Sequence, residues 1–212
     1  MLELELVVGV TAGVAALLSR VFTPERKWRR RLRRARLTPI ARLEEDTVAR
    51  IVGTVRALGP NLIAPLSRRP CVGFLATAHR RDAQTDYIAA RGSHMVPFVV
   101  EDETGRALVD ATDAQLALVM SATLHRQLVS EVLASELCFV LMPGARLDGQ
   151  LDLEEGILQV GDRVAVLGSG TREPDPDAVG EVDYRSGGAT RLCMTSSRRF
   201  PLVISNEAAA LT

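Results

Sequence analysis

Alternating apolar and polar residues between positions 96 and 110 give the clearest local signal in the chain. Phe98 and Val100 share one face of the first run, as in a strand with one side on a core, and a second run covers Arg106–Asp110. An aspartate can accept hydrogen bonds from the backbone two residues on, and a glycine adopts a positive φ without penalty. With Asp102 and Gly105 at its ends, the intervening segment predicts a β-hairpin closed by a type I turn with a glycine bulge.

Other short runs extend this β pattern along the chain. Strands are predicted at Arg50–Ala57, Arg163–Leu167, Gly180–Arg185, Thr190–Met194 and Phe200–Ile204, with a hairpin around Gly187-Gly188 and a polar linker over Glu173–Asp177. Apolar residues at roughly helical spacing between Ala114 and Leu137 predict a helical insertion instead. The expected fold is mainly β: a small OB-like barrel or a sandwich, with a helical insertion and an amino-terminal membrane-anchor helix.

The amino-terminal anchor is inferred from an apolar stretch that runs from Leu4 to Phe22, interrupted by Glu5 and Arg20. Its length is close to the ~20 residues that a spanning helix needs. A cleaved signal peptide carries positive charge before its apolar run, whereas the early charges here are acidic. We therefore expect a single-pass anchor; a helix lying on the membrane and a buried helix of a soluble protein are the alternatives.

A dense basic segment follows the apolar stretch at once. Positive charge and an aromatic residue at a helix end are typical of the cytoplasmic side of a membrane, where they contact anionic head groups. The predicted contacts with the membrane surface are Arg26, Lys27, Trp28, Arg29, Arg30, Arg31, Arg33, Arg34 and Arg36. The expected location is the cell membrane, with the β domain in the cytoplasm.

This reading divides the chain into four parts. Residues 1–23 form the membrane helix, 24–48 the basic juxtamembrane segment, 49–206 the β domain and 207–212 a carboxy-terminal tail. At 212 residues the chain is long enough for one principal domain.

Composition and residue spacing provide no catalytic or metal site. The net charge is zero, and the three cysteines form no CxxC pair, which argues against a zinc site and fits a reducing compartment. His79, His94 and His125 are too far apart for a local ligand motif. Cys71 precedes an apolar run and is expected to pack as a small hydrophobe. We expect no cofactor and no metal, and a binding protein rather than an enzyme.

Several short motifs carry a resemblance to a known family. They are Ile51-Val52-Gly53-Thr54-Val55, the segment Leu66-Ser67-Arg68-Arg69-Pro70-Cys71, the hairpin at 97–110, Glu154–Gly168 with its Gly-Asp pair, and Phe200–Asn206. In this order they resemble the GIDE domain, also called the beside-a-membrane domain, of mitochondrial membrane-anchored ubiquitin ligases and their prokaryotic relatives. The resemblance implies a β-rich, membrane-adjacent module that binds partner or substrate proteins.

Two departures from the family limit what the resemblance implies. Catalysis in those ligases belongs to a carboxy-terminal RING, and this chain has no Cys or His after Cys193 to hold its zinc. The second transmembrane segment of the eukaryotic ligases is also missing. The resemblance therefore does not imply ubiquitin transfer by this chain.

The predicted function is a membrane-anchored protein-binding or scaffold module without catalysis. Candidate contact surfaces are the helical insertion and the loops at 60–70 and 80–93, with Leu66, Ser67, Arg68, Arg69, Arg80 and Arg81 as candidate partner-binding residues. One alternative is a component of a ubiquitin-ligase-like enzyme whose zinc-bearing part is another protein. A second is an OB-type barrel for nucleic acid, which the few aromatic residues argue against.

Overall fold

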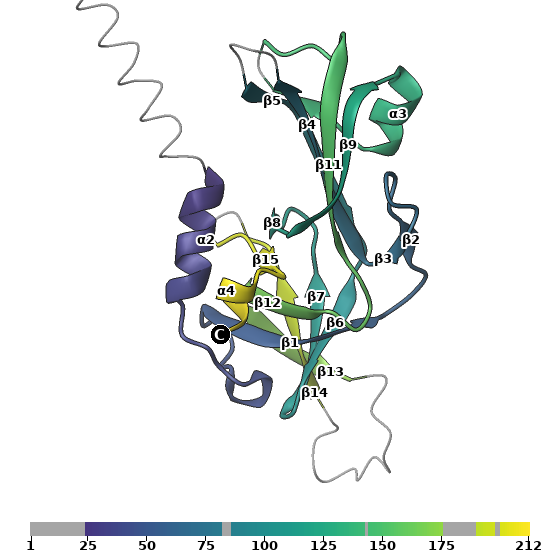
Figure 1. Ribbon diagram of the computed structural model, residues 1–212. Coiled ribbons are helices and arrows are strands. Elements are labelled where there is room, and N and C mark those ends of the chain that lie inside the picture. The colour runs from purple at the N-terminus through teal and green to yellow at the C-terminus, as the bar shows by residue number, and fades with distance from the viewer. Residues whose placement is uncertain (1–23, 82–85, 143, 176–189, 198–199) are drawn as a thin grey trace, which may run out of the picture.

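The computed structural model describes residues 24–81, 86–142, 144–175, 190–197 and 200–212 (Figure 1). The predicted membrane helix, the strand at Gly180–Arg185 and the turn at Gly187-Gly188 lie outside these residues. Among the described helices, none has the length and apolar character needed to cross a bilayer.

The described chain is mainly β, with three α-helices. In chain order the elements are α2 (Pro24–Arg34), a 3-10 helix η1 (Ile40–Arg42), β1 (Ala49–Ala57), β2 (Leu62–Ile63), β3 (Pro70–Cys71), β4 (Gly73–Arg81), β5 (Asp86–Met95), β6 (Phe98–Asp102), β7 (Gly105–Asp110), β8 (Gln115–Ala117), β9 (Met120–Leu128), α3 (Glu131–Glu136), β10 (Val140–Leu141), β11 (Gln150–Leu158), β12 (Arg163–Gly168), β13 (Gly170–Pro174), β14 (Thr190–Thr195), β15 (Val203–Ser205) and α4 (Ala208–Leu211).

An eight-stranded sheet forms the lower part of the molecule in Figure 1. Its strand order is β13-β14-β7-β6-β1-β12-β15-β8. β13 begins two residues after β12 ends, yet four strands separate the two in the sheet. The sheet must therefore curl back on itself, and the bend lies at Gly168–Gly170, where a Cβ on Gly168 would collide with the Leu202 side chain.

The curled sheet does not close. Within the described residues its end strands are β13 and β8, and no ladder joins them, so the OB-like closed barrel expected from the sequence is not what forms. The inner face of the sheet surrounds one apolar cluster that includes Ile51, Phe98 and Val166, all fully buried. The mainly β prediction is confirmed, and the closed barrel is corrected to a curled open sheet.

A five-stranded sheet, ordered β10-β5-β4-β11-β9, rises from the first. One face of it carries a second buried cluster, including Phe74, Leu151 and Leu153, that is covered by the β2–β3 ribbon, α3 and the segment after α3. Its opposite face carries charged residues of β4 and β11, such as His79 and Glu154.

The β-hairpin predicted between residues 96 and 110 is confirmed. β6 pairs with β7 with Asp102 opposite Gly105, and the Asp102 carboxylate accepts hydrogen bonds from the amides of Thr104 and Gly105 at 2.7 and 2.9 Å. Gly105 does not adopt the positive φ that a glycine bulge requires, so the expected bulge is absent and the turn has only two residues. The strands predicted at Arg50–Ala57 and Arg163–Leu167 correspond to β1 and β12.

Three sequence predictions about local structure are wrong in whole or in part. Half of the segment 114–137 is strand, in β8 and β9, and its helical part is α3, near the end. The expected loop at 80–93 largely belongs to β4 and β5, and the expected linker at 173–177 begins as the end of β13. In each case pairing with another strand fixes the backbone, which the pattern within the segment itself does not reveal.

Candidate functional site

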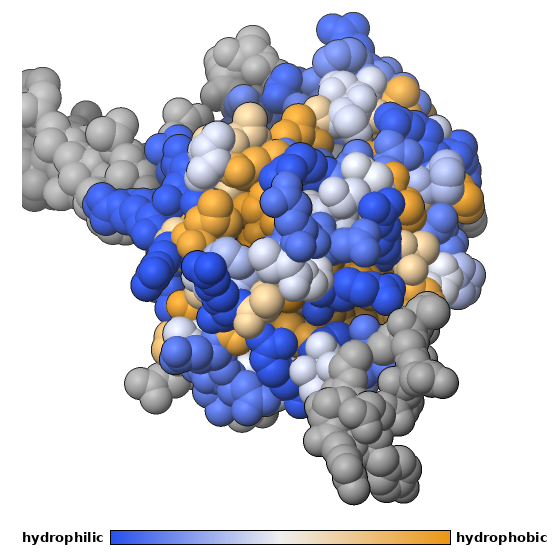
Figure 2. Space-filling view, turned by 90° about the horizontal axis from the view of Figure 1, so that it is seen from below, coloured by the Kyte–Doolittle hydropathy of each residue, from blue (hydrophilic) through white to orange (hydrophobic). Residues whose placement is uncertain are grey.

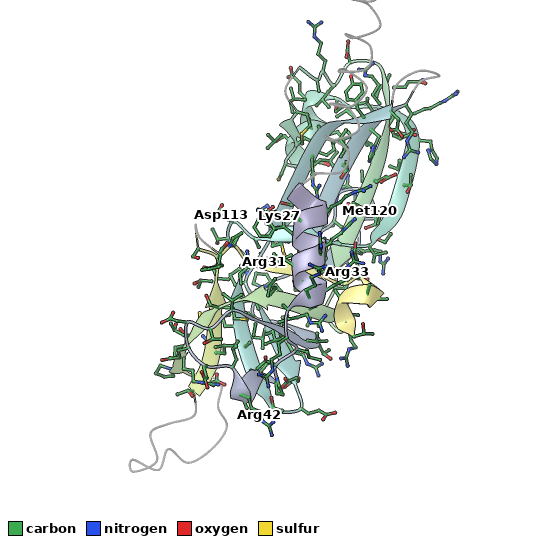
Figure 3. The ribbon with its side chains drawn as sticks, turned by 90° about the vertical axis from the view of Figure 1, so that its left-hand side faces the viewer. Lys27, Arg31, Arg33, Arg42, Asp113 and Met120 are labelled. Carbon is green, nitrogen blue, oxygen red and sulfur yellow. The ribbon has the colours of Figure 1, made fainter. Side chains whose placement is uncertain are left out.

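The basic helix α2 lies along the outside of the molecule, at the level where the two sheets meet (Figures 1 and 3). Pro24 suits its first turn because proline lacks the amide hydrogen that has no partner there. The helix ends before Thr38-Pro39, and the chain then pairs with β1 through a bridge between Leu37 and Arg50. The basic segment is thus part of the folded body rather than a separate linker.

One face of α2 packs on the outer side of the curled sheet. Leu32 is 1% exposed and lies in a cluster with Val52, Leu167 and Val203, and Trp28 packs against the same cluster. Because residues 28, 32 and 35 recur at helical spacing, they form the inward stripe of the helix.

Cations at the border of this stripe bind the protein itself. Arg29 forms an ion pair of 2.8 Å with Glu207, beside α4. The Arg31 guanidinium lies over the Phe200 ring at 5.2 Å and near the Trp28 ring at 5.9 Å. Three predicted membrane contacts, Trp28, Arg29 and Arg31, are therefore half-buried against the body.

Among the side chains of α2 that the structure describes, every exposed one is a cation. These exposed residues are Arg26, Lys27, Arg30, Arg33 and Arg34, and Arg36 is exposed just beyond the helix end. No ion pair joins these six to a carboxylate within the described chain. From Arg26 to Arg34 this cationic strip spans about 12 Å of helix axis. That length is close to the ~8–10 Å screening distance at physiological salt, so the charges act together on an anionic surface.

The candidate partner-binding loop is built around a buried carboxylate. Glu155 is 0% exposed, and its two oxygens accept hydrogen bonds from the amides of Leu66 and Ser67 at 2.8 and 3.0 Å. Backbone bonds between Ala64 and residues 68 and 69 close the same loop, and Arg68 is held at a φ of 56°. The loop is therefore fixed in one conformation before any partner arrives.

The outer side of this loop presents cations and exposed apolar residues. The Arg68 side chain is 68% exposed and lies 3.4 Å from Glu136, while Arg69 donates a hydrogen bond to Gln159. Ile63 on β2 is 58% exposed. The loop and β2 lie on the right of Figure 1, on the side of the molecule opposite α2. Seen from below, the surface is mostly hydrophilic with hydrophobic side chains visible between polar ones (Figure 2).

The other two candidate partner-binding residues, Arg80 and Arg81, lie at the end of β4. Arg80 is bound to Asp148 at 2.7 Å, and Arg81 lies 3.4 Å from Glu154 and 3.6 Å from Asp86. Both guanidiniums are thus neutralised by carboxylates of the same sheet region, which distinguishes them from the cations of α2.

The candidate metal ligands and nucleophiles weighed from the sequence can be placed among the described residues. No group of three or more His, Cys, Asp or Glu side chains among them is arranged to hold a metal ion. Cys71 is 0% exposed, and burial, with the nearby Glu155 charge, raises the pKa of its thiol. His79 and His125 lie 3.4 Å from Glu154 and Asp152 respectively, and Arg81 lies 3.4 and 3.9 Å from the same two carboxylates.

Sequence reasoning missed the role of Glu155. Its position in the run Leu151, Leu153, Glu155 places it on the buried side of a strand by period-2 alternation. That alternation was the available signal.

A scan of protein-family models found no match to this chain, and neither did searches of curated proteins and of solved structures.

Proposed function

We propose that this protein is a membrane-attached module that binds a partner protein and has no catalytic activity of its own. The observation that carries the proposal is the division of α2 into two faces. Its apolar stripe is used by the fold, and its outward strip consists of cations that no carboxylate of the described chain neutralises. An anionic lipid surface is the partner that such a strip fits best when it follows an apolar segment of near-spanning length.

Two further observations support the protein-binding part. The loop at 64–69 is fixed in advance by Glu155, so little conformational entropy is lost when it binds. It also places Arg68 and Arg69 beside the exposed Ile63, a combination of charge and apolar surface that suits a protein partner. The resemblance to the GIDE domain suggests the same kind of function.

The observed aromatic residues favour this proposal over a nucleic-acid-binding barrel. Bases bind such barrels by stacking on exposed rings. Phe74 is 4% exposed and Phe98 0%, whereas Trp28 packs against the body. Tyr87 is the aromatic residue exposed within the described part of the chain, and a single ring does not make a stacking surface.

The membrane part is tested by synthesising the full chain in a cell-free system with preformed vesicles of phosphatidylcholine, with or without phosphatidylglycerol. The variant Arg30→Gln/Arg33→Gln/Arg34→Gln removes three outward cations of α2. The control Arg42→Gln/Arg146→Gln/Arg163→Gln removes three exposed arginines elsewhere. The measured quantity is the ratio of vesicle-bound protein in the two lipid mixtures.

We expect the α2 variant to lose most of the preference for anionic vesicles. A basic residue near an anionic surface contributes about 1 kcal/mol, so three contribute about 3 kcal/mol, or roughly a hundredfold in partition coefficient. Equal preference in the α2 variant and the control would refute the role of α2. RNA can also be added to the wild-type protein as a competitor. If RNA removes the preference for anionic vesicles to the same extent as the α2 substitutions do, nucleic acid is the better ligand of these cations.

The protein-binding part is tested by proximity labelling from the full chain in the cells that produce it. Ile63→Glu places a charge on the exposed face of β2 without touching Glu155, and Val140→Glu, at a residue 68% exposed on β10, is the matched control. We expect a specific set of labelled proteins to be lost with Ile63→Glu and kept with Val140→Glu. An unchanged set in both would exclude this surface.

A further inference from the structure

A cavity of about 360 Å³ lies between α2 and the two sheets. Its apolar wall is formed by residues of five separate parts of the fold: Trp28 of α2, Leu75 of β4, Ile88 of β5, Met142 just after β10, and Val203 of β15. The volume is within the ~300–1,000 Å³ range of small-molecule sites, at its lower end. A site of this size takes a short apolar chain rather than a large cofactor.

One strong cation lies at the wall of this cavity. Arg91 on β5 contributes its guanidinium, which donates a long hydrogen bond of 3.4 Å to the carbonyl of Leu116. Arg91 is half-buried, and this burial lowers the pKa of its guanidinium from the ordinary value. Ser93 and Gln115 supply the remaining polar groups of the wall. An apolar chamber with one cation is complementary to an amphiphile that has one anionic head.

The position of the cavity adds a second argument. Trp28, which lines it, belongs to the same helix as the cationic strip, and Lys27 lies next to it over the indole ring at 5.6 Å. Anionic amphiphiles that gather at the strip therefore reach the cavity by moving less than the width of α2, about 10–12 Å.

We propose that this cavity binds the acyl chain of an anionic amphiphile whose head group pairs with Arg91. The inference rests on the proposed function for the source of the ligand, since the membrane is where such amphiphiles occur. The chemistry required is a carboxylate or phosphate on a single short apolar chain segment. A free fatty acid and a phospholipid both provide it.

The chain contains a single tryptophan, and it lines the cavity, so the protein carries its own probe. Full-length protein is reconstituted in phosphatidylcholine vesicles and titrated with bromoundecanoate, whose bromine quenches indole fluorescence on contact. Bromoundecanol is the uncharged control, and phosphatidylglycerol brominated on its chain is the lipid counterpart. We expect saturable quenching by one or both anions, at a concentration at least about tenfold lower than for the alcohol.

Two variants separate binding in the cavity from simple partition into the bilayer. Arg91→Gln removes the cation, and Ser93→Leu fills part of the cavity from an exposed strand position. Both should weaken quenching by the anions about tenfold while circular dichroism and thermal unfolding report a folded protein; Arg91→Lys should restore part of the effect. Quenching that is unsaturable, or equal in wild type, Arg91→Gln and Ser93→Leu, would overturn the proposal.

The outcomes distinguish this inference from the proposed function. The variant with Arg30, Arg33 and Arg34 replaced should lose its preference for anionic vesicles yet retain saturable quenching by bromoundecanoate. If the wild-type protein prefers anionic vesicles but shows no saturable quenching, ligand binding in the cavity is refuted and the proposed membrane attachment is not. Quenching by bromoundecanoate but not by the brominated lipid assigns the site to free fatty acids, and the reverse assigns it to phospholipids.

Discussion

The buried carboxylate of Glu155 should be worth several kilocalories per mole to the loop that it holds. Glu155→Gln keeps the size of the side chain but retains only one acceptor oxygen for the amides of Leu66 and Ser67. The other amide then faces an NH₂ group, which cannot accept a hydrogen bond. The substitution therefore isolates the effect of the second acceptor and of the charge.

The magnitude follows from the two hydrogen bonds at 2.8 and 3.0 Å. Losing one bond to a charged acceptor costs about 1.5–3 kcal/mol, and leaving a buried amide unpaired adds about 1–3 kcal/mol. Removing a buried charge returns part of this, because burial of a carboxylate is itself unfavourable. We expect a net loss of about 3 kcal/mol, or roughly a hundredfold faster amide exchange at Leu66 and Ser67.

The assay is hydrogen–deuterium exchange of the full chain in lipid vesicles, read on peptides that cover residues 64–69, together with urea unfolding. Glu136→Gln is the matched control, because it makes the same chemical change at a side chain that is 45% exposed and 3.4 Å from Arg68. An exposed pair of this kind contributes about 0–1 kcal/mol. Unchanged exchange in Glu155→Gln, or equal effects of the two substitutions, would refute the reasoning.

Three other predictions follow from the described contacts. Burial alone would raise the pKa of Asp102, but hydrogen bonds from the Thr104 hydroxyl and from backbone amides hold the pKa below its ordinary value. The stability that the Asp102 carboxylate contributes is therefore present above the unfolded pKa of ~3.9 and is lost as the pH falls through the folded pKa. Asp102→Asn should destabilise the protein at neutral pH in thermal unfolding, and the difference from wild type should vanish in acid. Gly53→Ala should lower the free energy of unfolding in urea by about 1–3 kcal/mol, because its Cβ would lie 2.5 Å from the Glu101 carbonyl oxygen. Gly59→Ala, with open space around the new Cβ, should be nearly neutral. Equal losses of stability in the two variants would contradict the close contact at Gly53. In mass-spectrometric labelling with iodoacetamide, the exposed Cys138 should react much faster than the buried Cys71, and rapid labelling of Cys71 in the folded protein would contradict its packing.

Local signals were sufficient for the parts of the fold that local chemistry determines. The 96–110 hairpin could be predicted because Asp102 supplies its own turn contacts. The segment at 114–137 could not, because apolar residues four apart share a face in a helix and equally in a strand. Met120 and Leu124 belong to β9, whose pairing with β11 decides between the two, and β11 lies about 30 residues further along the chain.

The candidate site was predictable to a similar degree. The run of basic residues was evident, but its division into an inward and an outward face depends on where Leu32 docks on the sheet. The role of Glu155 and the cavity beside Trp28 both depend on contacts between distant segments. The period-2 spacing of its strand places Glu155 on the buried side, but it does not reveal that the amides of Leu66 and Ser67 are its partners.

The docking of α2 fixes how the module would stand on a membrane. A basic helix joined by a flexible linker could bind lipid in any orientation of the domain that follows. Here Leu32 and the Arg29–Glu207 ion pair hold the helix along the body, so lipid bound to the cationic strip must lie alongside the outer face of α2. The loop held by Glu155 is on the opposite side of the molecule and would then point away from the bilayer, toward partner proteins (Figure 1). Because Leu32 is what holds the helix, Leu32→Ala should leave the charge unchanged yet allow the domain to reorient, which spin-label distances between the membrane and residue 63 would detect.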